Sequence, residues 1–188
     1  MNTPNKLTLL RIILVPIFLV FLMWSAIPYG FIGALIVFIG ASITDSLDGH
    51  IARKNNIVTN FGKFLDPLAD KVLVTSALIC FIELKLASAV AVVIIIAREF
   101  LVTSLRLVAN EGGVVIAASI WGKLKTVTQM VSIITILTFG AFVQLFPMFN
   151  LPVFTLIGEV LIWISAAITV MSGIEYLWTN RSVINTKK

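Results

Sequence analysis

Four aspartates are concentrated in one short stretch of an otherwise apolar chain. Asp45, Asp48, Asp66 and Asp70 make up almost half of its nine acidic residues. Carboxylates beside or inside an apolar phase are costly, and they tend to persist where they bind a cation or move a proton. We therefore expect the chemistry of this chain in this segment.

Spacing divides the four aspartates into two pairs. On a helix, Asp45 and Asp48 are three residues apart and Asp66 and Asp70 are four apart, so that each pair shares a face. Four carboxylates together repel one another, and hard divalent cations such as Mg²⁺ or Mn²⁺ are the natural compensation. Two such ions can clamp a phosphate during a displacement. The alternative is that the aspartates are solvated charges or ion-pair partners of Arg53 and nearby lysines.

The residues after the first pair favour a ligand that carries phosphate. Gly49 and Ala52 extend the first face with little or no side chain, which lets a bulky ligand approach the backbone. Arg53 follows, and its planar guanidinium suits phosphate. His50 is interpreted as a packing or solvent-facing residue rather than as a metal ligand.

Six long apolar runs must position these residues. Hydrophobic residues make up 59% of the chain and charged residues 12%, with a mean hydropathy of +1.06, whereas soluble domains have about 45–50% and about 25%. A membrane span needs roughly 20 residues. We predict an all-α integral membrane protein, a six-transmembrane-helix bundle forming one domain over residues 1–188. The predicted spans are Leu7–Trp24, Tyr29–Thr44, Phe64–Ile82, Leu86–Ala109, Val127–Phe146 and Pro152–Trp178.

Basic residues orient this bundle. They flank the start of the first span, lie between spans two and three, border the connection between four and five, and follow span six. The opposite connections hold only Lys85. The positive-inside rule then places both termini and the aspartates on the cytoplasmic side of the plasma membrane. We attribute the net charge of +5 to this bias and to anionic lipids or phosphorylated substrates, not to nucleic acid.

The aspartate segment also resembles a known family. It is similar to the pattern D-x2-D-G-x2-A-R-x8-G-x3-D-x3-D of the CDP-alcohol phosphatidyltransferases, with every fixed position and spacing present from Asp45 to Asp70. The start of the chain, Pro4 to Arg11, resembles the amino-terminal segment of that family. The stretches from Ala97 to Arg106 and from Gly122 to Thr126 resemble its branch that accepts glycerol 3-phosphate.

The resemblance implies a reaction and a set of site residues. Members of the family transfer a phosphatidyl group from CDP-diacylglycerol to an alcohol and release CMP, in a six-helix bundle, generally a homodimer, with a polar cavity at the cytoplasmic face. It implies that two divalent cations, Mg²⁺ or Mn²⁺, bind among the four aspartates and that Asp70 also takes the proton of the acceptor hydroxyl. The residues implied in binding CDP-diacylglycerol are Gly49, Ala52, Arg53, Thr59, Gly62, Asn5 and Thr8.

Basic residues of the fourth and fifth spans are the candidates for the acceptor. Glycerol 3-phosphate carries a dianionic phosphate, so its pocket should be basic. Arg98 and Arg106 are eight apart, about two helical turns, and share a face, while Lys123 and Lys125 open the fifth span. We expect Glu99 to hold or orient a basic partner, although a direct pair with Arg98 is not expected because neighbouring helix positions point apart. The alternative is a structural network around Arg98 and Glu99 with ordinary cytoplasmic lysines.

Two other hypotheses stay open. A different acceptor, such as serine, inositol phosphate or phosphatidylglycerol, would use the same metal site. A cation transporter would explain carboxylates in the membrane, but not Arg53, the small residues Gly49 and Ala52, or the basic residues of spans four and five. The sixth span, with Glu159 and Glu175, is the least informative part of the chain.

Overall fold

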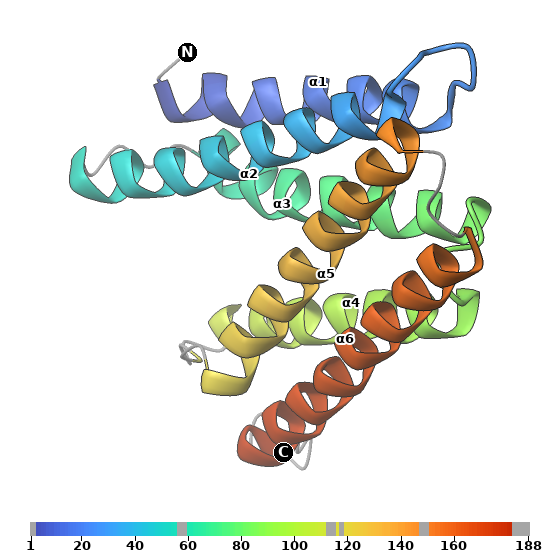
Figure 1. The fold of residues 1–188 in the computed structure, drawn as a ribbon. Helices are drawn as coiled ribbons and strands as arrows, with labels where there is room; N and C mark the ends of the chain where they lie inside the picture. The colour runs from blue at the N-terminus through green and yellow to red at the C-terminus, as the bar shows by residue number, and fades with distance from the viewer. Residues whose placement is uncertain (1–2, 56–59, 112–115, 117–118, 147–150, 182–188) are drawn as a thin grey trace.

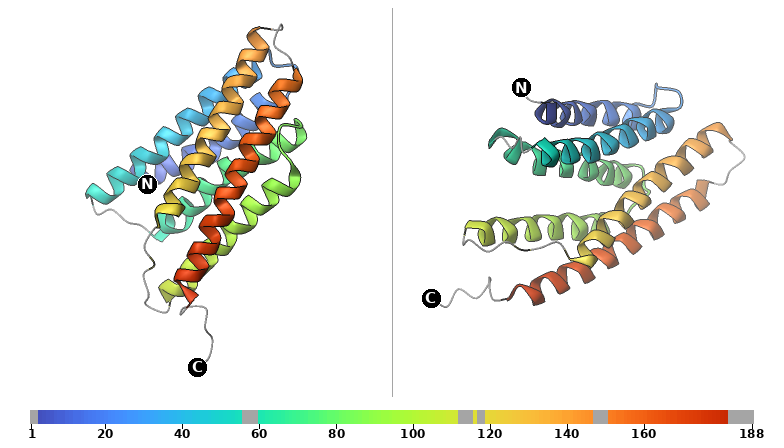
Figure 2. Two further views of the ribbon diagram at one scale, coloured as in Figure 1. Left: turned by 60° about the horizontal axis from the view of Figure 1, so that its bottom comes forward. Right: turned by 90° about the vertical axis from the view of Figure 1, so that its left-hand side faces the viewer.

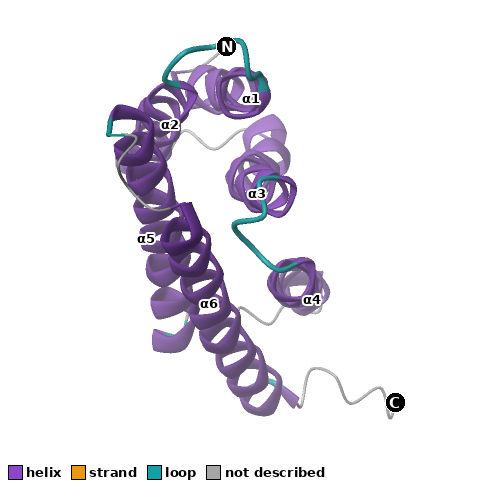
Figure 3. Ribbon diagram, turned by 45° about the vertical axis from the view of Figure 1, so that its right-hand side comes forward, coloured by secondary structure: helices purple, strands orange, loops and turns teal. Residues whose placement is uncertain are grey.

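The computed structural model of the protein describes residues 3–55, 60–111, 116, 119–146 and 151–181, with side chains described outside 3–8, 45–55, 60–70, 110 and 111. This part of the chain is helical and contains no strand (Figure 3). The helices are α1 (Thr3–Met23), α2 (Gly30–Asn55), α3 (Asn60–Glu83), α4 (Ala89–Glu111), α5 (Ile120–Leu145) and α6 (Leu151–Thr179). Each helix contains most of one predicted span, so the expected number and order of helices are confirmed.

Three helices extend beyond their predicted spans. Helix α2 continues to Asn55 and α3 begins at Asn60, so both reach into the aspartate segment, as the predicted aspartate faces require. Helix α5 begins at Ile120, seven residues before the predicted span that starts at Val127, so it includes part of the expected connection at 110–125. Ser119 caps this helix, and its Oγ accepts a hydrogen bond from the Gly122 N–H at 3.1 Å. A cap of this kind starts a helix well before its apolar run begins.

The helices form two groups, α1 to α3 and α4 to α6, that share one core. Helix α1 packs against α2 and α3, while α5 and α6 form a hairpin that crosses from α2 to α4 (Figures 1 and 2). Phe18 of α1 and Phe38 of α2 are completely buried, with ring centroids 6.0 Å apart. The core continues through Phe81, Ile95 and other buried residues. The C-terminal ends of α2 and α4 and the N-terminal ends of α3 and α5 lie toward the same end of the bundle (Figure 1).

The turn between α3 and α4 brings α6 close to the other helices. Lys85 adopts a left-handed conformation with a φ of 58°, and the Leu86 N–H donates to the Phe81 carbonyl at 2.8 Å. These two features form a Schellman motif that ends α3. Gly158 of α6 lies directly against this turn, because a Cβ added there would stand 2.6 Å from the Leu86 carbonyl oxygen. The missing side chain therefore allows α6 to pack alongside α4.

The outer surface of the helices is strongly apolar. Ile36, Val93 and Phe100 are each more than 60% exposed, and an extensive apolar surface marks a membrane or protein contact. Among the described residues, α5 and α6 are long and apolar enough to cross a membrane, and shorter apolar stretches occupy Leu9–Met23 and Gly30–Thr44. The structure is thus consistent with a membrane protein, while six spans and their orientation stay predictions.

Candidate active site

The four aspartates lie on two helices, as predicted. Asp45 and Asp48 belong to the C-terminal part of α2, and Asp66 and Asp70 belong to the N-terminal part of α3. At 3.6 residues per turn, spacings of three and four keep each pair on one face of its helix. Their side chains lie outside the described part, so that metal binding by them stays a prediction. A donor set made only of carboxylates suits hard cations such as Mg²⁺ and Mn²⁺.

The residues predicted to bind CDP-diacylglycerol are distributed over three helices. Helix α1 carries two of them, α2 three and α3 one, whereas Thr59 lies outside the described residues. Only the backbone of the six helical residues is described, and their contacts stay predictions. These six are Asn5, Thr8, Gly49, Ala52, Arg53 and Gly62.

A basic cavity lies between α3, α4, α5 and α6, where the aspartate-bearing part of α3 ends. Its volume is about 570 Å³. Glu99 is the only carboxylate among the described residues that line it. Facing this one carboxylate are five basic residues, which are Lys71, Arg98, Arg106, Lys123 and Lys125. All four residues predicted to bind the acceptor phosphate therefore line one cavity, and phosphate binding by them stays a prediction.

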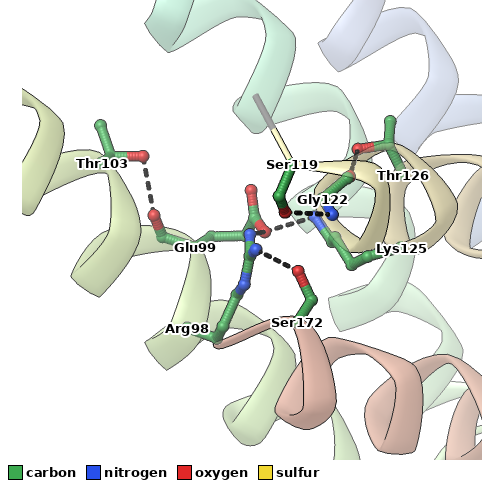
Figure 4. Close-up of polar contacts among 8 residues, drawn as sticks. All are labelled: Arg98, Glu99, Thr103, Ser119, Gly122, Lys125, Thr126 and Ser172. Atoms are coloured by element: carbon green, nitrogen blue, oxygen red, sulfur yellow. Dashed lines mark hydrogen bonds and ion pairs between the residues drawn. The ribbon is translucent and has the colours of Figure 1, made fainter. Parts of the chain in front are cut away.

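Glu99 holds two of these basic residues (Figure 4). Its Oε1 accepts hydrogen bonds from Arg98 Nη1 at 3.1 Å and from Lys125 Nζ. Arg98 also reaches α6, where its Nη2 donates to Ser172 Oγ at 2.6 Å. This network joins α4, α5 and α6 at the cavity wall, and it confirms the prediction that Glu99 holds a basic partner.

The expectation that Arg98 and Glu99 would not pair directly is wrong. Consecutive residues of a helix do point about 100° apart, but both side chains are long enough to curve back toward each other. The Arg98 and Lys125 side chains are only 13% and 6% exposed, and a charge buried to that extent is costly unless it is paired. The structural network considered as an alternative is thus present, and it forms part of the cavity wall.

Arg106 and Lys123 differ from this buried pair. Both are exposed, and neither forms an ion pair with a carboxylate that the structure describes. The Arg106 Cζ lies 5.7 Å from the centroid of the Tyr176 ring, a cation–π arrangement. Five basic residues beside the one carboxylate described there favour a positive potential in the cavity. It is therefore suited to an anionic ligand.

Sequence reasoning did not place in a site Lys71 and Tyr176, which line the cavity, or Ser172, which contacts Arg98. Lys71 directly follows Asp70, and this adjacency was the available signal. Ser172 and Tyr176 lie on α6, where no motif marks them. They belong to a series of buried polar residues that recur every three or four positions on an apolar helix, namely Ser165, Thr169, Ser172 and Tyr176. Such a series indicates a polar face directed into the bundle.

Comparison with known proteins identifies the family. Residues 1–171 match the family model described as CDP-alcohol phosphatidyltransferase. The chain belongs to this family. The resemblance carried by the aspartate segment is thereby confirmed, and it favours a transferase over a cation transporter.

Several similar proteins are named CDP-diacylglycerol–glycerol-3-phosphate 3-phosphatidyltransferase. The protein of that name from Bacillus subtilis is 43% identical over 200 residues, covering 98% of both chains. Those from Rickettsia bellii and Haemophilus influenzae are 38% and 36% identical, covering 93% and 94% of this chain and 93% and 91% of their own. The likeness to each of these relatives therefore extends over nearly the whole chain.

Proposed function

We propose that this chain transfers the phosphatidyl group of CDP-diacylglycerol to sn-glycerol 3-phosphate, producing phosphatidylglycerophosphate and CMP in phospholipid biosynthesis. The names of relatives that match along nearly the whole chain support this reaction. The structural observation that carries it is the adjacency of two oppositely charged regions, since Lys71, which lines the basic cavity, directly follows Asp70. An anionic acceptor in the cavity would lie beside the aspartate-bearing helices.

The proposed reaction is a displacement at phosphorus. The acceptor hydroxyl oxygen attacks the phosphorus that carries diacylglycerol, the P–O bond to CMP breaks, and CMP leaves with the electron pair. Asp70 takes the hydroxyl proton, because a positioned carboxylate assists a weak nucleophile. Two divalent cations, Mg²⁺ or Mn²⁺, would supply charge stabilisation for the diphosphate when bound. The residues proposed to hold them are Asp45, Asp48, Asp66 and Asp70.

The remaining site residues would bind the two substrates. Gly49, Ala52 and Gly62 would give the cytidine diphosphate group room against the backbone, and Arg53 would pair with its phosphates. Thr59, Asn5 and Thr8 complete the set proposed for this substrate. Arg98, Arg106, Lys123 and Lys125 would bind the acceptor phosphate.

The four acceptor residues would not contribute equally. Arg106 and Lys123 are exposed and can reach a phosphate directly. Arg98 and Lys125 share Glu99 as their ion-pair partner. They would therefore supply a fixed positive wall beside the bound phosphate. A dianion could thus bind without displacing Glu99 from Arg98 and Lys125.

We also propose the setting of the reaction. Six helices of a single domain would span the plasma membrane, with both termini and the site on the cytoplasmic side, and the chain would form a homodimer. The alternation of basic connections supports this orientation, and the apolar outer surface of the helices supports the membrane setting. Lipid tails could then remain in the bilayer while the headgroup meets a soluble acceptor.

Purified protein in liposomes tests the reaction. With CDP-diacylglycerol, glycerol 3-phosphate and Mg²⁺ or Mn²⁺, we expect equal amounts of CMP and phosphatidylglycerophosphate, and we expect chelation by EDTA to stop their formation. Replacing the acceptor by serine, inositol phosphate or phosphatidylglycerol separates the alternatives. A preference for serine would overturn the assigned acceptor. Metal flux without CMP release would overturn the transferase.

A further inference from the structure

The C-terminal third of α6 contacts both arginines that α4 contributes to the basic cavity. Ser172 Oγ accepts a hydrogen bond from Arg98 Nη2 at 2.6 Å, and the Tyr176 ring lies 5.7 Å from the Arg106 Cζ. Ser172 and Tyr176 are four residues apart and therefore lie on one face of α6. One face of α6 thus touches two cations that are about two helical turns apart on α4.

Gly173 allows Arg98 to lie close against α6. A Cβ added at Gly173 would stand 3.2 Å from the Arg98 Cγ, which is tighter than ordinary van der Waals contact. The side-chain stem of Arg98 therefore rests on the backbone of α6, while Ser172 fixes its guanidinium (Figure 4). Residues at this point of α6 determine where the Arg98 charge lies.

Tyr176 is placed differently from an aromatic residue that anchors a helix at the membrane interface. Trp178, two residues later, is 71% exposed, as expected for an interfacial anchor, whereas Tyr176 is 2% exposed and lines the basic cavity. The Tyr176 hydroxyl has no hydrogen-bond partner within the described residues. The described polar contact of the Tyr176 side chain is thus made by the ring, with the Arg106 guanidinium.

We propose that Ser172, Gly173 and Tyr176 form a platform that positions Arg98 and Arg106 for the phosphate of the acceptor. Tyr176 is a positioning residue for Arg106, and it favours phosphorylated acceptors by holding that guanidinium at the cavity. This inference rests on the proposed function. The family match ends at residue 171, so the platform lies in a segment that the match does not reach.

Two substitutions distinguish the contribution of the Tyr176 ring from that of its hydroxyl. Tyr176→Phe keeps the ring, and we expect the KM for glycerol 3-phosphate to stay within about twofold of the wild-type value. Tyr176→Leu removes the ring, and the KM should rise roughly threefold to twentyfold, the range of a partly desolvated cation–π pair. The kcat and the KM for CDP-diacylglycerol should change little. Tyr176→Met, which fills similar space without a ring, serves if the Leu variant does not fold.

Trp178→Leu is the matched control. Trp178 lies on the same helix and pairs with Arg181, whose Cζ is 5.5 Å from the ring, but neither residue is among those that line the basic cavity. Loss of this pair should leave the KM for glycerol 3-phosphate unchanged. An equal rise in the control would show that any lost ring on α6 weakens binding, and it would overturn the inference.

A double-mutant cycle tests whether Tyr176 acts through Arg106. In the Arg106→Gln background, Tyr176→Leu should produce no further rise in the KM for glycerol 3-phosphate. A full additional rise there, an unchanged KM in the Leu variant, or an equal rise in the Phe variant would each contradict the positioning role. The proposed function fails separately, because wild-type protein would then release no CMP with glycerol 3-phosphate.

Discussion

The aspartate-bearing segment of α2 and α3 and the basic cavity between α3, α4, α5 and α6 carry opposite charge excesses. The segment holds four aspartates on two consecutive helices. The cavity gathers five basic residues around Glu99, the one carboxylate described there. An uncompensated cluster of either sign is unfavourable in an apolar protein. This contrast supports the proposal that a ligand of opposite charge binds in each region, cations in one and a phosphate in the other.

Within the basic cavity, buried and exposed cations also differ. Arg98 and Lys125 are largely buried and share Glu99, whereas Arg106 and Lys123 are exposed. Removing one partner of a buried ion pair lowers the free energy of unfolding by several kcal/mol. The stability of the fold therefore depends on Glu99. The exposed pair is available to a ligand. We therefore expect substitutions of different residues to affect turnover, acceptor binding and stability separately.

The largest effect is expected in the aspartate-bearing segment. Asp70→Asn removes the proposed base, and kcat should fall by about 10²- to 10⁴-fold, while the KM for glycerol 3-phosphate stays within a few-fold. Initial rates of CMP release at saturating Mn²⁺ measure this and limit the contribution of weakened metal binding. Turnover near the wild-type rate would remove Asp70 from the chemistry.

A smaller effect of a different kind is expected in the basic cavity. Arg106→Gln should raise the KM for glycerol 3-phosphate roughly tenfold to a hundredfold, because hydrogen bonds to charged groups contribute about 1.5–3 kcal/mol. The KM for CDP-diacylglycerol should not follow. Arg181→Gln is the control, since Arg181 pairs with Trp178 and is not among the residues lining the cavity. Equal effects of both substitutions would point to overall charge instead of a defined site.

At Glu99 we expect the smallest effect on turnover, because the main effect there is on the stability of the fold. Glu99→Gln leaves Arg98 and Lys125 without their shared negative charge, and it should lower the free energy of unfolding by about 1–3 kcal/mol, less than for a fully buried pair because Glu99 is 24% exposed. Unfolding in detergent by denaturant measures this. Glu83→Gln, at the exposed end of α3, should change nothing. Equal stability of the two variants would contradict the role assigned to Glu99.

Local patterns predicted the helices and the aspartate pairs because both depend on short-range spacing. Apolar runs gave the order of all six helices, and separations of three and four gave the shared faces of the aspartates. The start of α5 was missed because Ser119 caps that helix ahead of its apolar run. Capping is a side-chain interaction that hydrophobicity does not reveal.

The wall of the cavity depends on tertiary packing, and sequence reasoning found it only in part. Arg98 and Arg106 were predicted from their shared helix face, but Ser172 and Tyr176 come from a helix more than sixty residues later. The direct pair between Arg98 and Glu99 was missed because helix geometry fixes where side chains start and not where long ones end. Such contacts follow from how α6 packs on α4.

The ratio of kcat/KM for glycerol 3-phosphate to that for glycerol tests the central claim most directly. The two acceptors share the attacking hydroxyl and differ in the phosphate, which is the group that the basic cavity is proposed to bind. CMP release by wild-type protein with each acceptor should give a ratio of at least about a hundredfold. Comparable use of glycerol would show that the cavity does not recognise the acceptor phosphate, and it would contradict the account.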